Sequence, residues 1–149
     1  MGYPARRIAF EGKRHVREAE LLELVTCLRH KIVRRQYDRL GRRVERPGRH
    51  RMTTLIVEDD FVNRLVLQRR LAEYGETHIA VNGDEAVEAV ERMLETGAAY
   101  DLICLDIMLP GMDGQEALEK IRAAEADKGY RVGEGARIVM TTAQIGSAS

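Results

Sequence analysis

The sequence predicts an α/β protein in which a doubly wound parallel β-sheet carries helices on both faces. Two observations lead to this prediction. From residue 52 onward, short apolar runs rich in β-branched residues alternate with longer segments of helical spacing. Acidic residues also follow the ends of two of those runs, where such sheets collect their functional groups. With 44% hydrophobic residues, the 149-residue chain can bury a core.

The first half of this region is expected to form a strand, a helix and a second strand. Residues 53–57 are a β-branched apolar run, typical of a strand buried on both faces. Residues 61–74 have apolar positions at helical spacing, with Asp60 placed to cap this helix and Gly75 to end it. Residues 77–81 form the second predicted strand.

The second half continues the alternation of helix and strand. Residues 82–84 form a turn that also caps the next helix, and residues 110–114 form a loop shaped by proline and glycine. The remaining elements, in chain order, are a helix at 85–94, a strand at 101–105, a helix at 115–126 and a strand at 137–141.

The charge of the chain divides it into two unlike segments. Residues 1–51 carry 15 Lys and Arg against 6 Asp and Glu, whereas residues 52–149 carry 9 against 18. A breaker, Pro47-Gly48, lies just before the change. We therefore expect a basic helical or disordered extension at 1–51 and the α/β domain at 52–149.

Within the basic extension, Leu21, Val25, Leu28 and Ile32 form one apolar stripe of an amphipathic helix. Three interpretations of this extension stay open. It is a basic arm that contacts phosphates on nucleic acid or at a membrane surface, a solvated helix with a linker, or an upstream extension of a protein that starts at Met52.

Composition also excludes some classes of protein. No apolar run approaches the roughly 20 residues of a membrane span, and the first residues do not resemble a secretory signal. Cys27 and Cys104 have no paired metal or redox spacing, which excludes a disulfide scaffold. A cytoplasmic protein is the prediction.

Four acidic residues are expected to meet at one edge of the sheet. Glu58, Asp59 and Asp60 follow the first strand, and Asp106 ends the third. Because neighbouring parallel strands present their carboxyl ends at the same edge, these side chains should converge. Clustered carboxylates repel one another unless a cation neutralises them, and hard oxygen ligands suit Mg²⁺. The sequence therefore predicts a magnesium site, with Asp60 also explained as a helix cap.

Three segments resemble the receiver domain of bacterial two-component response regulators. They are LIVEDD at 55–60, LDIMLPGMDG at 105–114 and IVMTTA at 138–143. The resemblance implies a flavodoxin-like fold in which Asp106 is the phosphoacceptor. It further implies that Glu58, Asp59, Asp106 and the backbone carbonyl of Met108 hold Mg²⁺, and that Thr142 is the switch hydroxyl.

The function implied is that of a module in a two-component phosphorelay, which takes a phosphoryl group from a histidine kinase or phosphotransfer protein. We expect no enzymatic turnover of a separate substrate. One alternative is a phosphatase of the haloacid-dehalogenase type, but this class wants a second Asp where Met108 stands. The other is a non-phosphorylated interaction module in which the basic arm is the working part.

The resemblance is incomplete after the fourth predicted strand. Receivers normally continue with a helix, a strand that ends in a lysine, and a last helix, whereas only six residues follow Ala143. We therefore expect an exposed strand edge with apolar Ile138 and Met140, and a partly bare sheet face. A truncated and inactive remnant, a domain completed by a second chain, and a fragment of a longer product all fit this pattern.

Overall fold

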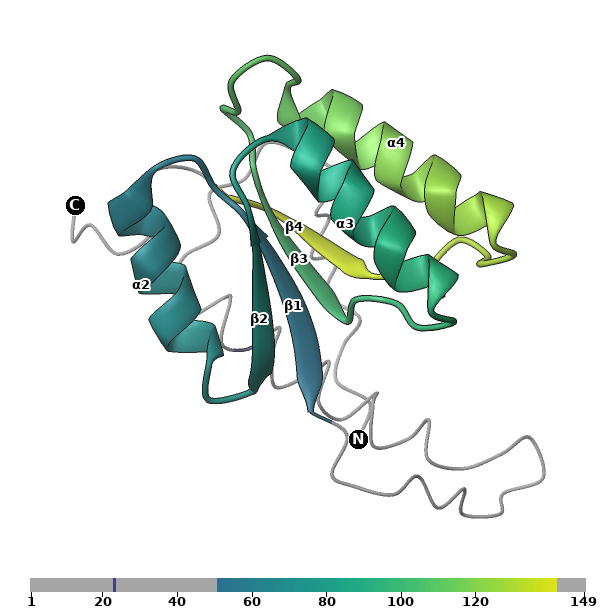
Figure 1. The fold of residues 1–149 in the computed structure, drawn as a ribbon, viewed down its shortest axis with the longest axis horizontal. Helices are drawn as coiled ribbons and strands as arrows, with labels where there is room; N and C mark the ends of the chain where they lie inside the picture. Colours follow the sequence, from purple (N-terminus) through teal and green to yellow (C-terminus); the bar gives the residue numbers. More distant parts are fainter. Residues whose placement is uncertain (1–22, 24–50, 142–149) are drawn as a thin grey trace.

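A computed structural model of the protein describes residue 23 and residues 51–141 (Figure 1). Strands and helices alternate strictly along the second of these ranges. In chain order they are β1 (Met52–Val57), α2 (Phe61–Leu71), β2 (Gly75–Ala80), α3 (Gly83–Glu95), β3 (Leu102–Asp106), α4 (Gly114–Asp127) and β4 (Arg137–Thr141).

The four strands form one parallel sheet in the order β2-β1-β3-β4. Strand β1 lies inside the sheet, with Val57 opposite Ala80 of β2 on one side and Leu105 of β3 on the other. The chain thus winds outward from β1 in both directions, which confirms the predicted doubly wound α/β fold. Glu58 and Asp106 come to the same edge because β1 and β3 are neighbours.

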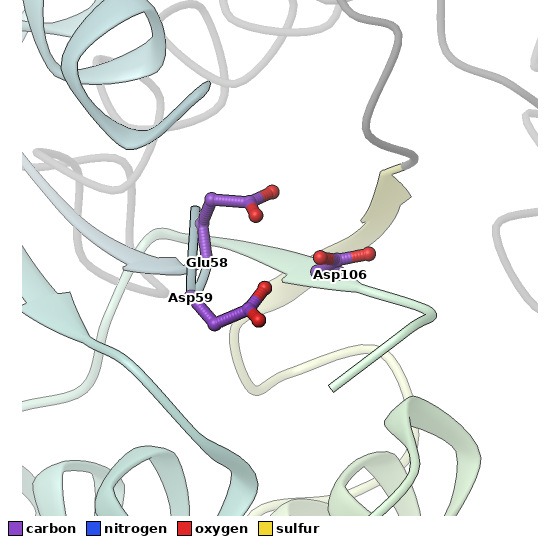
Figure 2. A group of neighbouring side chains, drawn as sticks. All are labelled: Glu58, Asp59 and Asp106. Atoms are coloured by element: carbon purple, nitrogen blue, oxygen red, sulfur yellow. The ribbon is translucent and has the colours of Figure 1, made fainter. Parts of the chain in front are cut away.

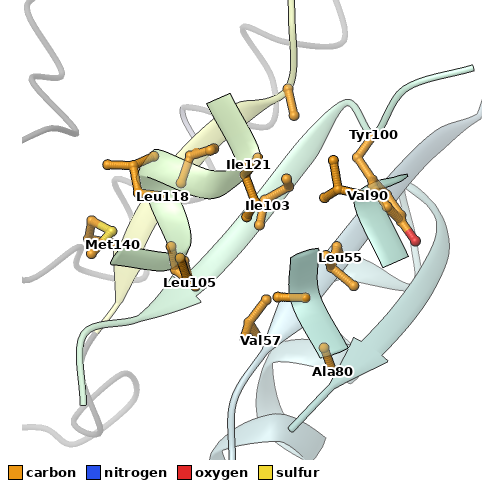
Figure 3. Packing of buried hydrophobic residues seen from close by; sticks show 14 of the residues in the cluster. Leu55, Val57, Ala80, Val90, Tyr100, Ile103, Leu105, Leu118, Ile121 and Met140 are labelled. Carbon is orange, nitrogen blue, oxygen red and sulfur yellow. The ribbon is translucent and has the colours of Figure 1, made fainter. Parts of the chain in front are cut away.

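Helices α3 and α4 pack side by side on one face of the sheet (Figure 1). Their apolar residues, among them Val90, Leu118 and Ile121, contact alternate residues of the strands, such as Leu55 and Ile103 (Figure 3). Alternation follows from the two-residue period of a strand, which sends successive side chains to opposite faces. This face holds the larger part of the core.

Helix α2 lies on the opposite face, where it packs on β1 and β2 (Figure 1). Its Leu67 and Leu71 belong to a second buried cluster, together with Met52, Ile56, Leu102, Cys104 and Val139 of the strands. We expected this face to be partly bare, and that prediction is wrong: Leu102, Cys104 and Val139 are each 0% exposed.

Strand β4 lies at one edge of the sheet over the described residues, as predicted, but its apolar side chains are buried. Ile138 and Met140 are 3% and 7% exposed, because both face inward to the core formed with α4. Strand β4 is held to the end of α4 by Glu125, whose carboxylate accepts the Ala136 N–H at 2.7 Å and the Arg122 guanidinium at 2.7 Å. Arg122 also donates to the Ala136 carbonyl, at 2.8 Å.

A side-chain cap begins each of the described helices α2, α3 and α4. Asp60, Asn82 and Asp113 accept the N–H three residues ahead, at 2.8–2.9 Å, and so satisfy donors that the first turn of a helix leaves free. The sequence identified Asp60 and the turn at 82–84 as caps, and both predictions are confirmed.

The predicted end of the first helix is wrong. Helix α2 ends at Leu71 rather than at 74, and Gly75 is the first residue of β2 instead of a helix terminator. Gly75 pairs with Met52, and a Cβ on it would lie 1.9 Å from the Met52 carbonyl oxygen. The glycine is therefore needed for the close approach of two strands.

Several predictions fall outside the described residues. These are the site residue Thr142 and almost all of the extension at 1–51, in which Glu23 is described and is helical and exposed. Over the part of the chain that is described, no helix is long and apolar enough to cross a membrane.

Candidate metal centre

Three carboxyl groups meet at the edge of the sheet where β1 and β3 end. Glu58 and Asp59 directly follow β1, and Asp106 is the last residue of β3. One oxygen from each of the three lies within 4.8 Å of those of the other two. Figure 2 shows the three side chains around a common space between the two strand ends. Asp60 points elsewhere, because its carboxylate caps α2.

Burial differs among the three acids. Glu58 and Asp106 are 1% and 2% exposed, whereas Asp59 lies at the surface. Two backbone N–H groups orient the buried pair: Asp60 donates to Glu58 Oε1 at 3.1 Å, and Met108 donates to Asp106 Oδ1 at 3.0 Å. The two buried acids are thus held in place, and the third lies on the solvent side of the site.

The surroundings of Glu58 and Asp106 favour their neutral forms. Burial raises the pKa of Glu58 to about 7, the Asp60 N–H opposes this, and the carboxylates of Asp106 and Asp59 add to it. Burial also raises the pKa of Asp106, against the N–H of Met108 and a hydrogen bond from Glu58. The cluster is therefore short of positive charge, and near neutral pH it retains a proton.

This donor set fits Mg²⁺. The ion prefers hard oxygen ligands, uses few protein carboxylates and keeps several water molecules. Here Glu58, Asp59 and Asp106 supply oxygens, and the exposed side at Asp59 leaves room for water or a phosphoryl oxygen. A divalent cation would also remove the repulsion that raises the two pKa values. The Met108 carbonyl, the fourth predicted ligand, stays a prediction.

The loop after β3 passes close to the site because Gly114 lacks a side chain. A Cβ at this position would lie 2.6 Å from the Asp106 carbonyl oxygen. Helix α4 therefore begins directly behind Asp106, and a larger residue would displace one of the two.

Sequence reasoning overlooked two features near the acids. Phe61 and Val62 at the start of α2, and Met108 after β3, are 65%, 64% and 76% exposed. They follow the metal-ligand candidates closely in the chain. Their position directly after the acids is the signal that could have drawn attention to them.

Thr141 is the second feature. It pairs with Asp106 in the sheet, is fully buried, and its hydroxyl oxygen has no hydrogen-bond partner. The sequence pattern pointed to the adjacent Thr142, which lies outside the described residues, and gave no reason to examine Thr141.

Comparison with known proteins gives a consistent result. The family model of the response regulator receiver domain matches residues 54–147. The sensor protein GacS of Pseudomonas syringae pv. syringae is 41% identical over 75 residues, which are 50% of this chain and 8% of that protein. The two-component response regulator ORR42 of Oryza sativa subsp. japonica is 40% identical over 76 residues, 50% of this chain and 54% of that protein. The chain thus covers less than two thirds of each relative's own length.

Solved structures agree with the fold. The receiver domain of the histidine kinase CKI1 from Arabidopsis thaliana, complexed with Mg²⁺ and BeF₃⁻, has a TM-score of 0.55 and 29% identity. The match covers 65% of this chain and 69% of that one. The same receiver domain complexed with Mg²⁺ alone has a TM-score of 0.53 and 31% identity, over 60% of this chain and 66% of that one.

Proposed function

Because this chain belongs to the response regulator receiver domain family, we propose that it accepts a phosphoryl group on Asp106 with the help of Mg²⁺. The observation that carries the proposal is the cluster of three carboxyl groups, in which one oxygen of each lies within 4.8 Å of the others. A lone aspartate is a weak nucleophile toward phosphorus, so the cluster needs a cation to act.

Each residue of the site has its own role in the transfer of the phosphoryl group. Asp106 attacks the phosphorus in line, forming an acyl phosphate bond as the bond from phosphorus to the donor atom breaks and that atom keeps the electron pair. The Met108 N–H holds Asp106 Oδ1, which leaves the other oxygen to attack. Glu58, Asp59 and Asp106 would hold Mg²⁺, which would supply positive charge to neutralise the phosphoryl oxygens.

Glu58 also controls the proton in the site. Its pKa of about 7 means that the carboxyl keeps a proton near neutral pH until a cation displaces it. A bound cation would therefore favour ionised Glu58, which could no longer donate its hydrogen bond to Asp106. Asp106 would then be ionised and able to act as the nucleophile.

Receiver domains of two-component systems work with histidine kinases or phosphotransfer proteins, and we propose such a partner here. The exposed apolar side chains of Phe61, Val62 and Met108 support this, because each offers an uncharged contact within a few residues of an acid of the cluster. The chain acts as a signalling module without turnover of a separate substrate. The switch role of Thr142, contact of residues 1–51 with nucleic acid, and a cytoplasmic location stay predictions.

The test is phosphorylation by a small donor. The full chain is incubated with acetyl phosphate and Mg²⁺, and its intact mass is measured with and without a chelator. We expect one phosphoryl group on the wild type and none on Asp106→Asn. Asp113→Asn is the matched control, because Asn keeps the helix cap and removes one nearby charge. A wild type that takes no phosphoryl group while it binds Mg²⁺ would point to an inactive receiver instead.

A further inference from the structure

One half of the sheet is buried on a face where the described elements supply little cover. Strands lie about 4.8 Å apart and a helix is about 10 Å wide, so one helix covers about two strands. Helices α3 and α4 together cover one face, whereas α2 on the other packs on β1 and β2 (Figure 1). Nevertheless Leu102, Cys104 and Val139 on the β3 and β4 half are 0% exposed.

Two parts of the chain outside the described residues are candidates to complete this cover. Residues 142–149 offer little apolar surface, because Ile145 is their one large apolar residue. Residues 1–50 contain the apolar stripe of Leu21, Val25, Leu28 and Ile32. We propose that this stripe packs on the β3 and β4 half of the sheet, opposite α4, so that the N-terminal segment completes the core.

The described residue of this segment supports the orientation. Glu23 is helical and exposed. At about 100° per residue, Glu23 lies roughly opposite the stripe on a helical wheel. A helix that presents Glu23 to solvent therefore presents Leu21, Val25 and Leu28 to the opposite side, where the sheet needs apolar cover.

Chain length and charge also fit this occupant. Residues 33–51 connect the stripe to β1, and a 19-residue linker reaches far beyond the roughly 10 Å between β1 and β4. Residues 1–51 carry nine more basic than acidic residues, and residues 52–149 carry nine more acidic than basic residues. Opposite net charges favour docking of the segment onto its own domain over release into solvent. The basic segment thus belongs to the fold and is not an independent arm.

Cys104 provides a direct probe of the covered face. In a Cys27→Ser background it is the single thiol of the full chain, and it is fully buried. We measure its alkylation by iodoacetamide in the parent, in Leu28→Asp and in His30→Asp. His30 lies on the far side of the helical wheel from the stripe, so the two variants add the same charge to opposite faces of one segment.

We expect alkylation at least about tenfold faster in Leu28→Asp than in the parent, and no change in His30→Asp. Far-UV circular dichroism verifies that the domain stays folded. If Leu28→Asp unfolds while His30→Asp does not, Leu28→Ala is measured instead, together with hydrogen exchange of the β4 amides. Faster exchange at β4 in Leu28→Ala supports the proposal.

Three results would overturn it. In the first, the folded Leu28 variants and the parent show the same rate of Cys104 alkylation and the same hydrogen exchange at β4. In the second, protection rises with protein concentration, which would assign the face to a second copy of the chain. In the third, protection is lost on deletion of residues 142–149 but not in the stripe variants, which would assign the face to the C-terminal residues.

Discussion

Glu58 and Asp106 share a hydrogen bond that moves their pKa values in opposite directions. The bond raises the pKa of Glu58, which donates the proton, and lowers that of Asp106, which accepts it. The two groups belong to different strand ends, so the sheet itself brings the proton donor to the acceptor.

Mg²⁺ binding should strengthen as the pH rises through about 7. A cation displaces the proton of Glu58, so below its pKa of about 7 each pH unit costs about a factor of ten in affinity. Isothermal titration calorimetry should show binding about tenfold weaker at pH 6 than at pH 8. If binding releases the Glu58 proton, the measured binding enthalpy should change with the ionisation enthalpy of the buffer that takes it up. An affinity that does not depend on pH would contradict the mechanism.

Glu58→Gln should stabilise the metal-free protein at alkaline pH. The pKa of Glu58 is raised in the folded state, so its contribution favours folding below the unfolded value and is lost as the pH rises through about 7. We expect a gain of about 2 kcal/mol in unfolding free energy at pH 8, and little change at pH 4. Urea unfolding in the presence of a chelator measures the unfolding free energies of the two proteins. With saturating Mg²⁺ the wild type should become the more stable of the two.

Asp59→Asn should weaken Mg²⁺ binding by about tenfold or more, because it removes a charged oxygen ligand from the cluster. Asp60→Asn is the adjacent control: it removes the same charge, retains the cap of α2 and lies outside the cluster. Calorimetry on both proteins separates ligation from general charge loss. Equal weakening in the two variants would argue against ligation by Asp59.

Thr141→Val should raise the unfolding free energy by about 1 kcal/mol, because it replaces a buried hydroxyl that has no partner with a methyl of similar size. Thr142→Val should instead reduce the difference in hydrogen exchange between phosphorylated and free protein. The adjacent threonines thus form a matched pair. If the Thr141 variant alone loses this difference, the switch role belongs to Thr141.

Glu125→Ala should destabilise the domain by about 3 kcal/mol, because the buried carboxylate links Arg122 to the Ala136 N–H. Glu125→Gln retains an acceptor and should cost less. Glu119→Ala removes an exposed acid from the same helix and should change stability by less than about 0.5 kcal/mol. Thermal unfolding measures the loss of stability in each of the three variants. Similar losses in all three would contradict a stabilising role for the contacts of Glu125 with Arg122 and Ala136.

The sequence predicted most of the fold because local patterns decide most of it. The strand at 137–141 and the first residue of α2 agree with the structure, since alternation and capping are properties of short segments. The end of α2 was not predictable in this way. Gly75 looks like a helix terminator in isolation, and only its pairing with Met52 explains why β2 begins there.

The candidate site was predictable as a set of acids but not in its details. Topology brings Glu58 and Asp106 to one edge, and a sequence read as parallel strands contains that information. Their burial and the orphaned hydroxyl of Thr141 depend on packing across three strands, which no local pattern records. The burial of Val139 likewise depends on distant parts of the chain.

The inner position of β1 sets an order of assembly during synthesis. Its partner β2 follows within one helical connection, but its other neighbour comes much later, with Leu102 pairing to Thr54. A nascent chain that has emerged only as far as α3 therefore has one edge of β1 open to solvent and to other chains. It also carries Glu58 and Asp59 without Asp106, so the cluster of three carboxyl groups can form only after β3 has emerged and closed that edge.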